Sequence, residues 1–214
     1  MAETSPDRGI VPSSLDELLR PEKCALVLWD LQNGLAGQTG ETPRLAPVWR
    51  KLMGAARESG ALIVRSRHLA PRPELMDLLT RWRITRRTHG ENRPDHYMQP
   101  GGQDTAFLEG FEPEPDELVI EKSVPSLFHN TPADARLRAR GITTVLLAGV
   151  ATDIGIDFTA RHAMAYGYFT AVIEDASASY TREAHEHAMA ILRPSVFVAS
   201  SDEVIAGWSR HGAA

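Results

Sequence analysis

Short apolar runs recur along the chain, and each is followed by a polar residue or a turn. The first extends without a break from Ala25 to Trp29, after which the chain becomes polar at Asp30. An apolar run of this length is typical of a strand that is buried on both faces, as in parallel sheets covered by helices. Similar runs predict further strands at 61–65, 118–121, 144–148, 168–173 and 195–199.

Helical periodicity fills most of the stretches between these runs. In 44–59, Leu45, Val48 and Leu52 recur near a helical period, and Gly60 suits the position just after a helix. Because predicted strands alternate with predicted helices, we expect an α/β fold with a mostly parallel six-stranded sheet. Further helices are expected at 131–140, 156–166, 202–209 and, behind a partial cap at Thr181, up to residue 192.

The chain ends and the middle differ from this regular pattern. A capping box from Ser14 to Glu17 predicts a short helix, so we expect an arm and a short helix over 1–20 and a single domain over 21–214. The stretch 71–116 is the least regular, and a long insertion of this kind in a compact domain is usually functional. Its candidates for substrate contact are Arg86, Arg87, His89, His96 and Tyr97, although each of them would also suit a solvated face.

Composition narrows the class of protein. With 24% charged and 43% hydrophobic residues and a net charge of −5, the chain is typical of soluble globular proteins and lacks the basic patch of a nucleic-acid-binding protein. No apolar run approaches the roughly 20 residues of a membrane span, and the N-terminus has no signal-peptide core. Cys24 is the only cysteine, which excludes an intrachain disulfide and favours a reducing, cytoplasmic location; it opens a strand and is expected in the core.

Two charged residues follow predicted strands. Asp30 comes directly after the first strand and Lys122 after the third. Ligands of open α/β sheets bind at the carboxyl ends of the strands, where a partly desolvated carboxylate can transfer protons. Lys122 would hold Asp30 ionised or bind an anionic substrate. Asp30 would also suit a loop cap, and Lys122 a solvated charge.

The third piece of the candidate site is the segment after the fourth strand. The strand ends near Gly149 and a helix begins within a few residues, so the turn offers backbone N–H groups to an anion or an oxyanion. The segment lacks the G-x-S-x-G sequence of a nucleophile elbow. The chain also has no dinucleotide-binding or P-loop glycine motif, and no cofactor is indicated.

Three segments together carry a family resemblance: LVLWDLQN, VIEKSVPSLFHNT, and AGVATDIGIDFTARHAMAYGY followed by VIEDASAS. In order and spacing they resemble the isochorismatase-like hydrolases, which include nicotinamidases, N-carbamoylsarcosine amidases and isochorismatases. The resemblance implies a three-layer α/β/α domain, a small-molecule substrate and a homo-oligomer, either a dimer or a tetramer. It also implies an Asp-Lys-Cys constellation, to which Asp30 and Lys122 correspond, and a non-proline cis peptide between Val150 and Ala151.

The chain departs from that pattern at Gly155, where the family has its cysteine nucleophile. A thioester mechanism is therefore not expected, and the glycine would leave room for water or a bulkier substrate. Isochorismatases resemble this chain in lacking the cysteine, and they hydrolyse an enol ether by protonation from the aspartate and attack of water. Their Tyr-Ala-His sequence in the elbow is replaced here by Ala151-Thr152-Asp153.

Metal ligands are not expected either. Nicotinamidases carry Asp-x-His after the second strand, and here the stretch reads Ser66-Arg67-His68. A lone histidine is more often a hydrogen-bonded loop residue than a ligand, so we predict no metal.

The sequence therefore predicts a hydrolase that works by acid–base chemistry of Asp30 without a covalent intermediate. Two alternatives are a catalytically inactive binding or scaffold protein on the same fold, and a C–N hydrolase that uses water directly. The candidate catalytic positions are Asp30, Lys122 and Gly155; backbone groups of Val150, Ala151 and Thr152 are expected to hold an oxyanion; and the candidates for substrate binding are Gln32, Arg86, Arg87, Tyr97 and His129.

Overall fold

The computed structural model describes residues 12, 14–90 and 94–211. The arm expected at 1–13 lies outside the described residues except for Pro12. The short helix expected after it is a single 3₁₀ turn, Asp16–Leu18. Within the described ranges, no helix is long and apolar enough to cross a membrane.

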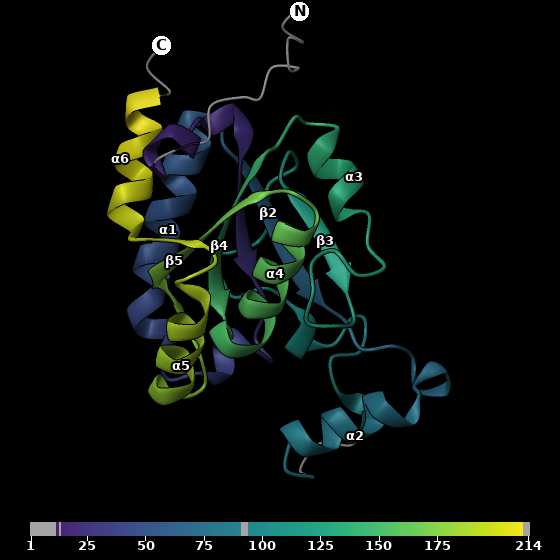
Figure 1. Ribbon diagram of the computed structural model, residues 1–214. Helices are drawn as coiled ribbons and strands as arrows, with labels where there is room; N and C mark the ends of the chain where they lie inside the picture. Colours follow the sequence, from purple (N-terminus) through teal and green to yellow (C-terminus); the bar gives the residue numbers. More distant parts are fainter. Residues whose placement is uncertain (1–11, 13, 91–93, 212–214) are drawn as a thin grey trace, which may run out of the picture.

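The predicted parallel sheet is confirmed, with six strands in the order β3-β2-β1-β4-β5-β6 (Figure 1). The strand order reverses between β1 and β4, which start the two halves of the sheet. In open α/β folds the crevice outside the carboxyl ends at such a point is where ligands bind. The strands are β1 Cys24–Trp29, β2 Leu62–His68, β3 Leu118–Lys122, β4 Thr144–Val150, β5 Phe169–Ala178 and β6 Phe197–Ala199.

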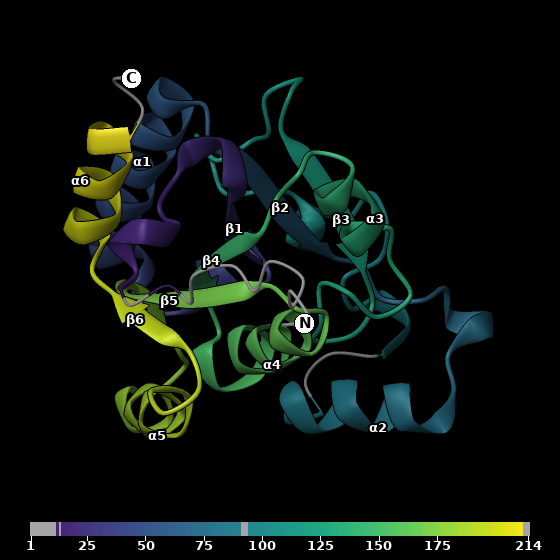
Figure 2. The same ribbon diagram turned by 45° about the horizontal axis from the view of Figure 1, so that its top comes forward.

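Helices cover both faces of the sheet, which gives the expected three-layer α/β/α arrangement (Figure 2). Side chains alternate between the faces along each strand. Leu26 and Leu28 of β1 join the core formed with α1 and α6, whereas Val27 and Trp29 join the core formed with α3, α4 and α5. The helices are α1 Thr42–Ser59, α3 Ala133–Arg138, α4 Asp157–Ala165, α5 Arg182–Leu192 and α6 Ser201–His211.

The stretch 71–116, expected to be the least regular part of the chain, contains one α-helix that was not predicted, α2, Leu78–Arg87. In Figure 1, α2 stands apart from the layers that enclose the sheet. Its apolar residues Leu78 and Trp82 are 86% and 59% exposed, and Ile84 is its buried residue. The helix therefore has no apolar stripe for a sequence pattern to reveal. Its start is fixed by Asp77, whose side chain accepts a hydrogen bond from the Thr80 N–H at 2.6 Å.

The ends of β1 and β4 approach each other very closely. Gly149 pairs with Trp29 and has a φ of 124°, and a Cβ at this position would lie 2.3 Å from the Trp29 carbonyl oxygen. Only glycine tolerates this φ and this distance. Gly149 thus lets the end of β1 lie directly against the turn that follows β4.

Candidate active site

A pocket of about 440 Å³ lies at the carboxyl edge of the sheet. Its walls come from the ends of β1, β2 and β3, from the turn after β4, and from α2. Asp30, Lys122 and Gly155 all line it, so the structure brings together the three positions predicted to be catalytic.

Asp30 and Lys122 form a buried ion pair. Lys122 Nζ donates to Asp30 Oδ2 at 2.9 Å, and the Ser66 hydroxyl donates to Asp30 Oδ1 at 2.5 Å. The Asp30 backbone has a left-handed φ of 52°, and its N–H donates to the Ser66 oxygen at 2.9 Å. Burial lowers the pKa of Lys122, and the charge and hydrogen bond of Asp30 partly oppose this shift. The pair is therefore held rigidly at the pocket wall, in surroundings that disfavour charge.

The space in front of Gly155 is filled, which corrects the expectation that this glycine leaves room for water or a bulkier substrate. A Cβ on Gly155 would lie 1.9 Å from Nε1 and 2.2 Å from Cε2 of Trp29. The Trp29 indole also lies under Lys122, with Nζ 4.2 Å from the ring centroid. Trp29 is 1% exposed and lines the pocket. The indole thus occupies the position of a side chain at 155.

The turn after β4 has the cis peptide between Val150 and Ala151 that the resemblance implied. Val150 and Ala151 line the pocket, as expected for backbone groups that face a substrate. Thr152 does not, and its hydroxyl is hydrogen-bonded to Nδ1 of His185 at 2.8 Å. The N–H of Gly155 donates to the Ala151 carbonyl at 3.1 Å. Two of the three backbone groups expected to hold an oxyanion therefore belong to residues of the pocket wall, Thr152 does not, and the oxyanion role of this turn stays a prediction.

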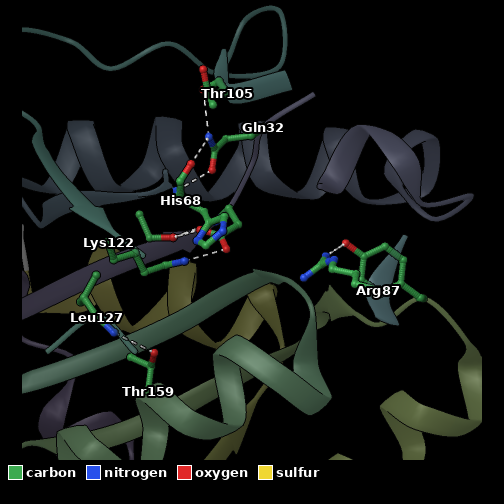
Figure 3. Close-up of polar contacts among 10 residues, drawn as sticks. Gln32, His68, Arg87, Thr105, Lys122, Leu127 and Thr159 are labelled. Atoms are coloured by element: carbon green, nitrogen blue, oxygen red, sulfur yellow. Dashed lines mark hydrogen bonds and ion pairs between the residues drawn. The ribbon is translucent and has the colours of Figure 1, made fainter. Parts of the chain in front are cut away.

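Three arginines of α2 bring positive charge to the opposite wall. Arg83, Arg86 and Arg87 line the pocket together with Lys122, and Asp30 is the one carboxylate among the described lining residues. Figure 3 shows the Lys122 amino group and the Arg87 guanidinium pointing toward each other from opposite sides. Such an excess of positive charge favours an anionic ligand.

Two tyrosines accompany Arg87. Its guanidinium donates to the Tyr180 hydroxyl and lies 5.0 Å from the centroid of that ring. Tyr97 lines the pocket and is 8% exposed, and its hydroxyl has no hydrogen-bond partner among the described residues. Burial raises the pKa of Tyr97 to about 12. A buried hydroxyl without a partner is costly, and a ligand oxygen in the pocket would satisfy it.

His68 and Ser66 do not form the start of a metal site. Ser66 is engaged with Asp30, and burial, followed by the charges of Lys122 and Arg87, lowers the pKa of His68 well below its usual range. Across the described ranges, no group of three or more His, Cys, Asp or Glu side chains is placed to hold a metal ion. The residues present therefore do not fit the Asp-x-His metal site of nicotinamidases.

Other predicted contacts lie away from the pocket. Gln32 is fully buried, and its amide donates to the carbonyls of His68 at 3.1 Å and Thr105 at 2.8 Å (Figure 3). Its oxygen accepts from the His68 N–H at 2.7 Å, so Gln32 ties the end of β2 to the loop at Thr105 and does not face a substrate. His129 is exposed after β3 and does not line the pocket. His89 and His96 are exposed and likewise absent from its wall.

Sequence reasoning did not identify Trp29, Ser66, Arg83 or Tyr180 as site residues. Ser66 lies just beyond the predicted strand 61–65, between two arginines, and Arg83 belongs to a helix without an apolar stripe. Trp29 precedes Asp30, but nothing local shows that it contacts Gly155. The one available signal was the combination of a very large residue beside Asp30 and a glycine in the turn.

Comparison with known proteins gives matches over most of the chain. The isochorismatase domain model matches residues 24–203. Ureidoacrylate amidohydrolase RutB from Cronobacter sakazakii is 31% identical over 179 residues, which cover 73% of this chain and 75% of that protein. N-carbamoylsarcosine amidase from Thermoplasma acidophilum is 27% identical, with a TM-score of 0.69 over 84% of this chain and 97% of that one.

A further structure is similar in fold alone. A cysteine hydrolase from Pseudomonas syringae pv. phaseolicola 1448A is 21% identical, with a TM-score of 0.80 over 89% of this chain and 94% of that one. The names of all three proteins are those of hydrolases.

Proposed function

This chain belongs to the isochorismatase family, and from that premise we propose that it hydrolyses a small anionic molecule without a cysteine nucleophile. The observation that carries the proposal is the buried pair of Asp30 and Lys122, which lines a pocket together with Gly155, the residue that the resemblance places at the family's cysteine position. Cys24, the only cysteine, is buried at the start of β1, and its thiol donates to the Leu18 carbonyl at 3.2 Å. It does not line the pocket.

Asp30 is the proposed acid and base. In an enol ether, protonated Asp30 gives its proton to the terminal carbon of the double bond and becomes a carboxylate. Water then adds to the resulting oxocarbenium carbon and returns a proton to Asp30, and the hemiketal collapses to a ketone and an alcohol. Lys122 holds the carboxyl group in place. Burial lowers the pKa of Lys122, so its charge beside Asp30 is less favourable than in an exposed ion pair.

The α2 arginines are the proposed anion-binding groups. A guanidinium binds a carboxylate through two parallel hydrogen bonds, which fixes both position and orientation. Arg86 and Arg87 were expected to bind substrate, and Arg83 is added from its place in the wall. The unpartnered Tyr97 hydroxyl supplies a further donor.

A turnover screen tests the proposal. Enol ethers, amides including ureidoacrylate, and small cyclic imides would each be offered as the free carboxylate and as its methyl ester. We expect hydrolysis of a carboxylate-bearing enol ether, weaker use of its ester, and loss of turnover in the Asp30→Asn protein. Turnover that persists in the Asp30→Asn protein would contradict the assignment of Asp30.

Water-assisted C–N hydrolysis is the second candidate, and the amidohydrolase and amidase names of relatives favour it. Turnover of an amide but of no enol ether would select it. Binding of a carboxylate compound with no turnover of any class would select a binding protein instead. Assembly into a homo-oligomer stays a prediction from the resemblance.

A further inference from the structure

The large side chain of Trp29 fills the space that a side chain on residue 155 would need. Built on the glycine, a Cβ would meet three indole atoms, Nε1 at 1.9 Å, Cε2 at 2.2 Å and Cζ2 at 2.5 Å. Real Cβ atoms do not come this close to other heavy atoms, so the rigid ring and a side chain at 155 exclude each other. Gly155 itself has an ordinary φ, which any residue could adopt. The ring of Trp29, and not the backbone, therefore requires glycine here.

The position of Trp29 follows from the sheet. Trp29 is the last residue of β1, and alternation along the strand directs its side chain to the α4 face, on which the turn containing Gly155 begins. The ring is held there by Lys122 on one face and by the core around Ile156. It cannot leave this position without opening that core.

The indole N–H is directed at the place of the missing side chain. Nε1 is the indole atom nearest to that place, 1.9 Å from a Cβ built on Gly155, and indole N–H groups in proteins usually donate to an acceptor. Trp29 belongs to the same pocket wall as Asp30 and Lys122. A substrate that reaches the acid–base pair therefore lies beside the Trp29 indole, whose N–H is close enough to the pair to donate to that substrate.

We propose that Trp29 is the specificity-determining residue of this pocket: its indole takes the place of a nucleophile at 155, excludes a side chain from it, and donates its N–H to an oxygen of the substrate. The fitting ligand group is a carboxylate, carbonyl or ether oxygen beside the atom that Asp30 protonates. The steric part stands on geometry alone, whereas the donor part rests on the proposed function.

A double-mutant cycle tests the steric part without any substrate. In a Cys24→Ala background, we compare the melting temperatures of the parent, Gly155→Cys, Trp29→Val, and Trp29→Val with Gly155→Cys. Gly155→Cys should lower the melting temperature by several degrees or prevent folding when Trp29 is present. It should cost much less when residue 29 is valine, because contacting residues are not additive.

The new thiol provides a second readout. In the folded Trp29→Val, Gly155→Cys protein it lies in the pocket near Lys122, and iodoacetamide should modify it faster than Cys24 in the natural chain. Equal costs of Gly155→Cys in both backgrounds would overturn the steric part. So would a combined variant that fails to fold while Trp29→Val alone folds.

The donor part is tested with Trp29→Phe, which keeps a ring but removes the N–H. For the compound identified by the turnover screen, or the tightest binder of that set if none is turned over, kcat/KM or affinity should fall roughly 3- to 10-fold. Trp208→Phe, a change in an equally buried indole on α6, is the control and should leave both unchanged. Unchanged kinetics in a stable Trp29→Phe protein would refute the donor role while leaving the proposed function intact. A set in which nothing binds or turns over would refute both.

Discussion

At the scale of single residues, Asp30 offers the sharpest substitution. Asparagine at this position can accept from Lys122 through its oxygen and donate to the Ser66 hydroxyl oxygen through its NH₂. Asp30→Asn should therefore fold, yet it cannot exchange a proton, and kcat should fall by ~10²–10⁴. Melting temperature and kcat measured on the same preparation check both parts. Ser66→Ala, which keeps the carboxylate, should lose much less activity, and a near-normal kcat in Asp30→Asn would remove the proposed acid.

The raised pKa of Tyr97 predicts how the free energy of unfolding changes at alkaline pH. Burial raises its pKa to about 12 from the ordinary 10.0, so the unfolded chain loses this proton at a lower pH than the folded chain. The stability that neutral Tyr97 contributes is complete below about pH 10 and is lost as the pH rises through about 12. Tyr97→Phe should reduce the alkaline decline in the free energy of unfolding by up to ~1.4 kcal/mol per pH unit. Urea unfolding checks this, and parallel declines of the two proteins would contradict it.

Cys24 allows a test of the proposal that hydrolysis proceeds without a cysteine nucleophile. Burial raises the pKa of its thiol to about 12, so little reactive thiolate is present at neutral pH. Turnover should survive treatment with iodoacetamide, and Cys24→Ala should keep kcat while losing ~1 kcal/mol of stability from packing and the bond to Leu18. Mass spectrometry during turnover should show no covalent adduct. A trapped adduct on any residue would contradict the proposed chemistry.

At the scale of elements, the placement of the three α2 arginines depends on the N-terminal cap of that helix. The Asp77 side chain accepts from the Thr80 N–H, and Ile84 is the buried residue of the helix. Asp77→Ala should fray α2, displace its arginines and raise KM several-fold with little change in kcat. Faster hydrogen exchange at 78–87 would accompany this change. Thr181→Ala removes the corresponding cap of α5, where Thr181 accepts from Ala184, and should leave KM unchanged.

Elements were predictable where burial imposes a pattern. The six strands and α1, α3, α4, α5 and α6 all bury apolar residues at regular spacing, and their predicted positions agree with the structure to within a few residues at most ends. The end of β5 is the exception, because the strand continues through Glu174 and Asp175 to Ala178 beyond its apolar part. The helix α2 escaped prediction for the same physical reason: its exposed Leu78 and Trp82 bury nothing that a periodicity could reveal.

At the scale of the whole molecule, the part of the site that follows from the parallel strand pattern could be predicted, and the part that depends on which strands are neighbours could not. Asp30 and Lys122 end parallel strands, so their common edge follows from the α/β pattern. The contact between Trp29 and Gly155 depends on β1 and β4 being neighbours, which no local pattern contains. The two strands lie so close that a Cβ built on Gly149 would be 2.3 Å from the Trp29 carbonyl oxygen. Gln32 was misplaced for a related reason, because its partner Thr105 comes from a distant loop.

The charge distribution of the whole molecule leads to the last prediction. The chain carries a net charge of −5, yet its pocket gathers Lys122 and three α2 arginines around Asp30, the one carboxylate among the lining residues that the structure describes. An anionic substrate is therefore attracted locally by a molecule that repels it overall. Because the Debye length shrinks from about 10 Å at 0.1 M salt to about 3 Å at 1 M, KM for a carboxylate substrate should rise several-fold over this range.

Steady-state kinetics over a salt series, with the substrate and its methyl ester side by side, measure this effect. The ester should show a much weaker salt dependence, since the attraction acts on the carboxylate charge. Arg83→Ala should flatten the salt dependence of KM for the acid, whereas Arg140→Ala, which removes an exposed arginine outside this pocket, should leave it unchanged. Equal salt dependence for the acid and the ester would mean that screening acts on the protein's overall charge and not on the α2 wall, and the anionic substrate class would then have to be abandoned.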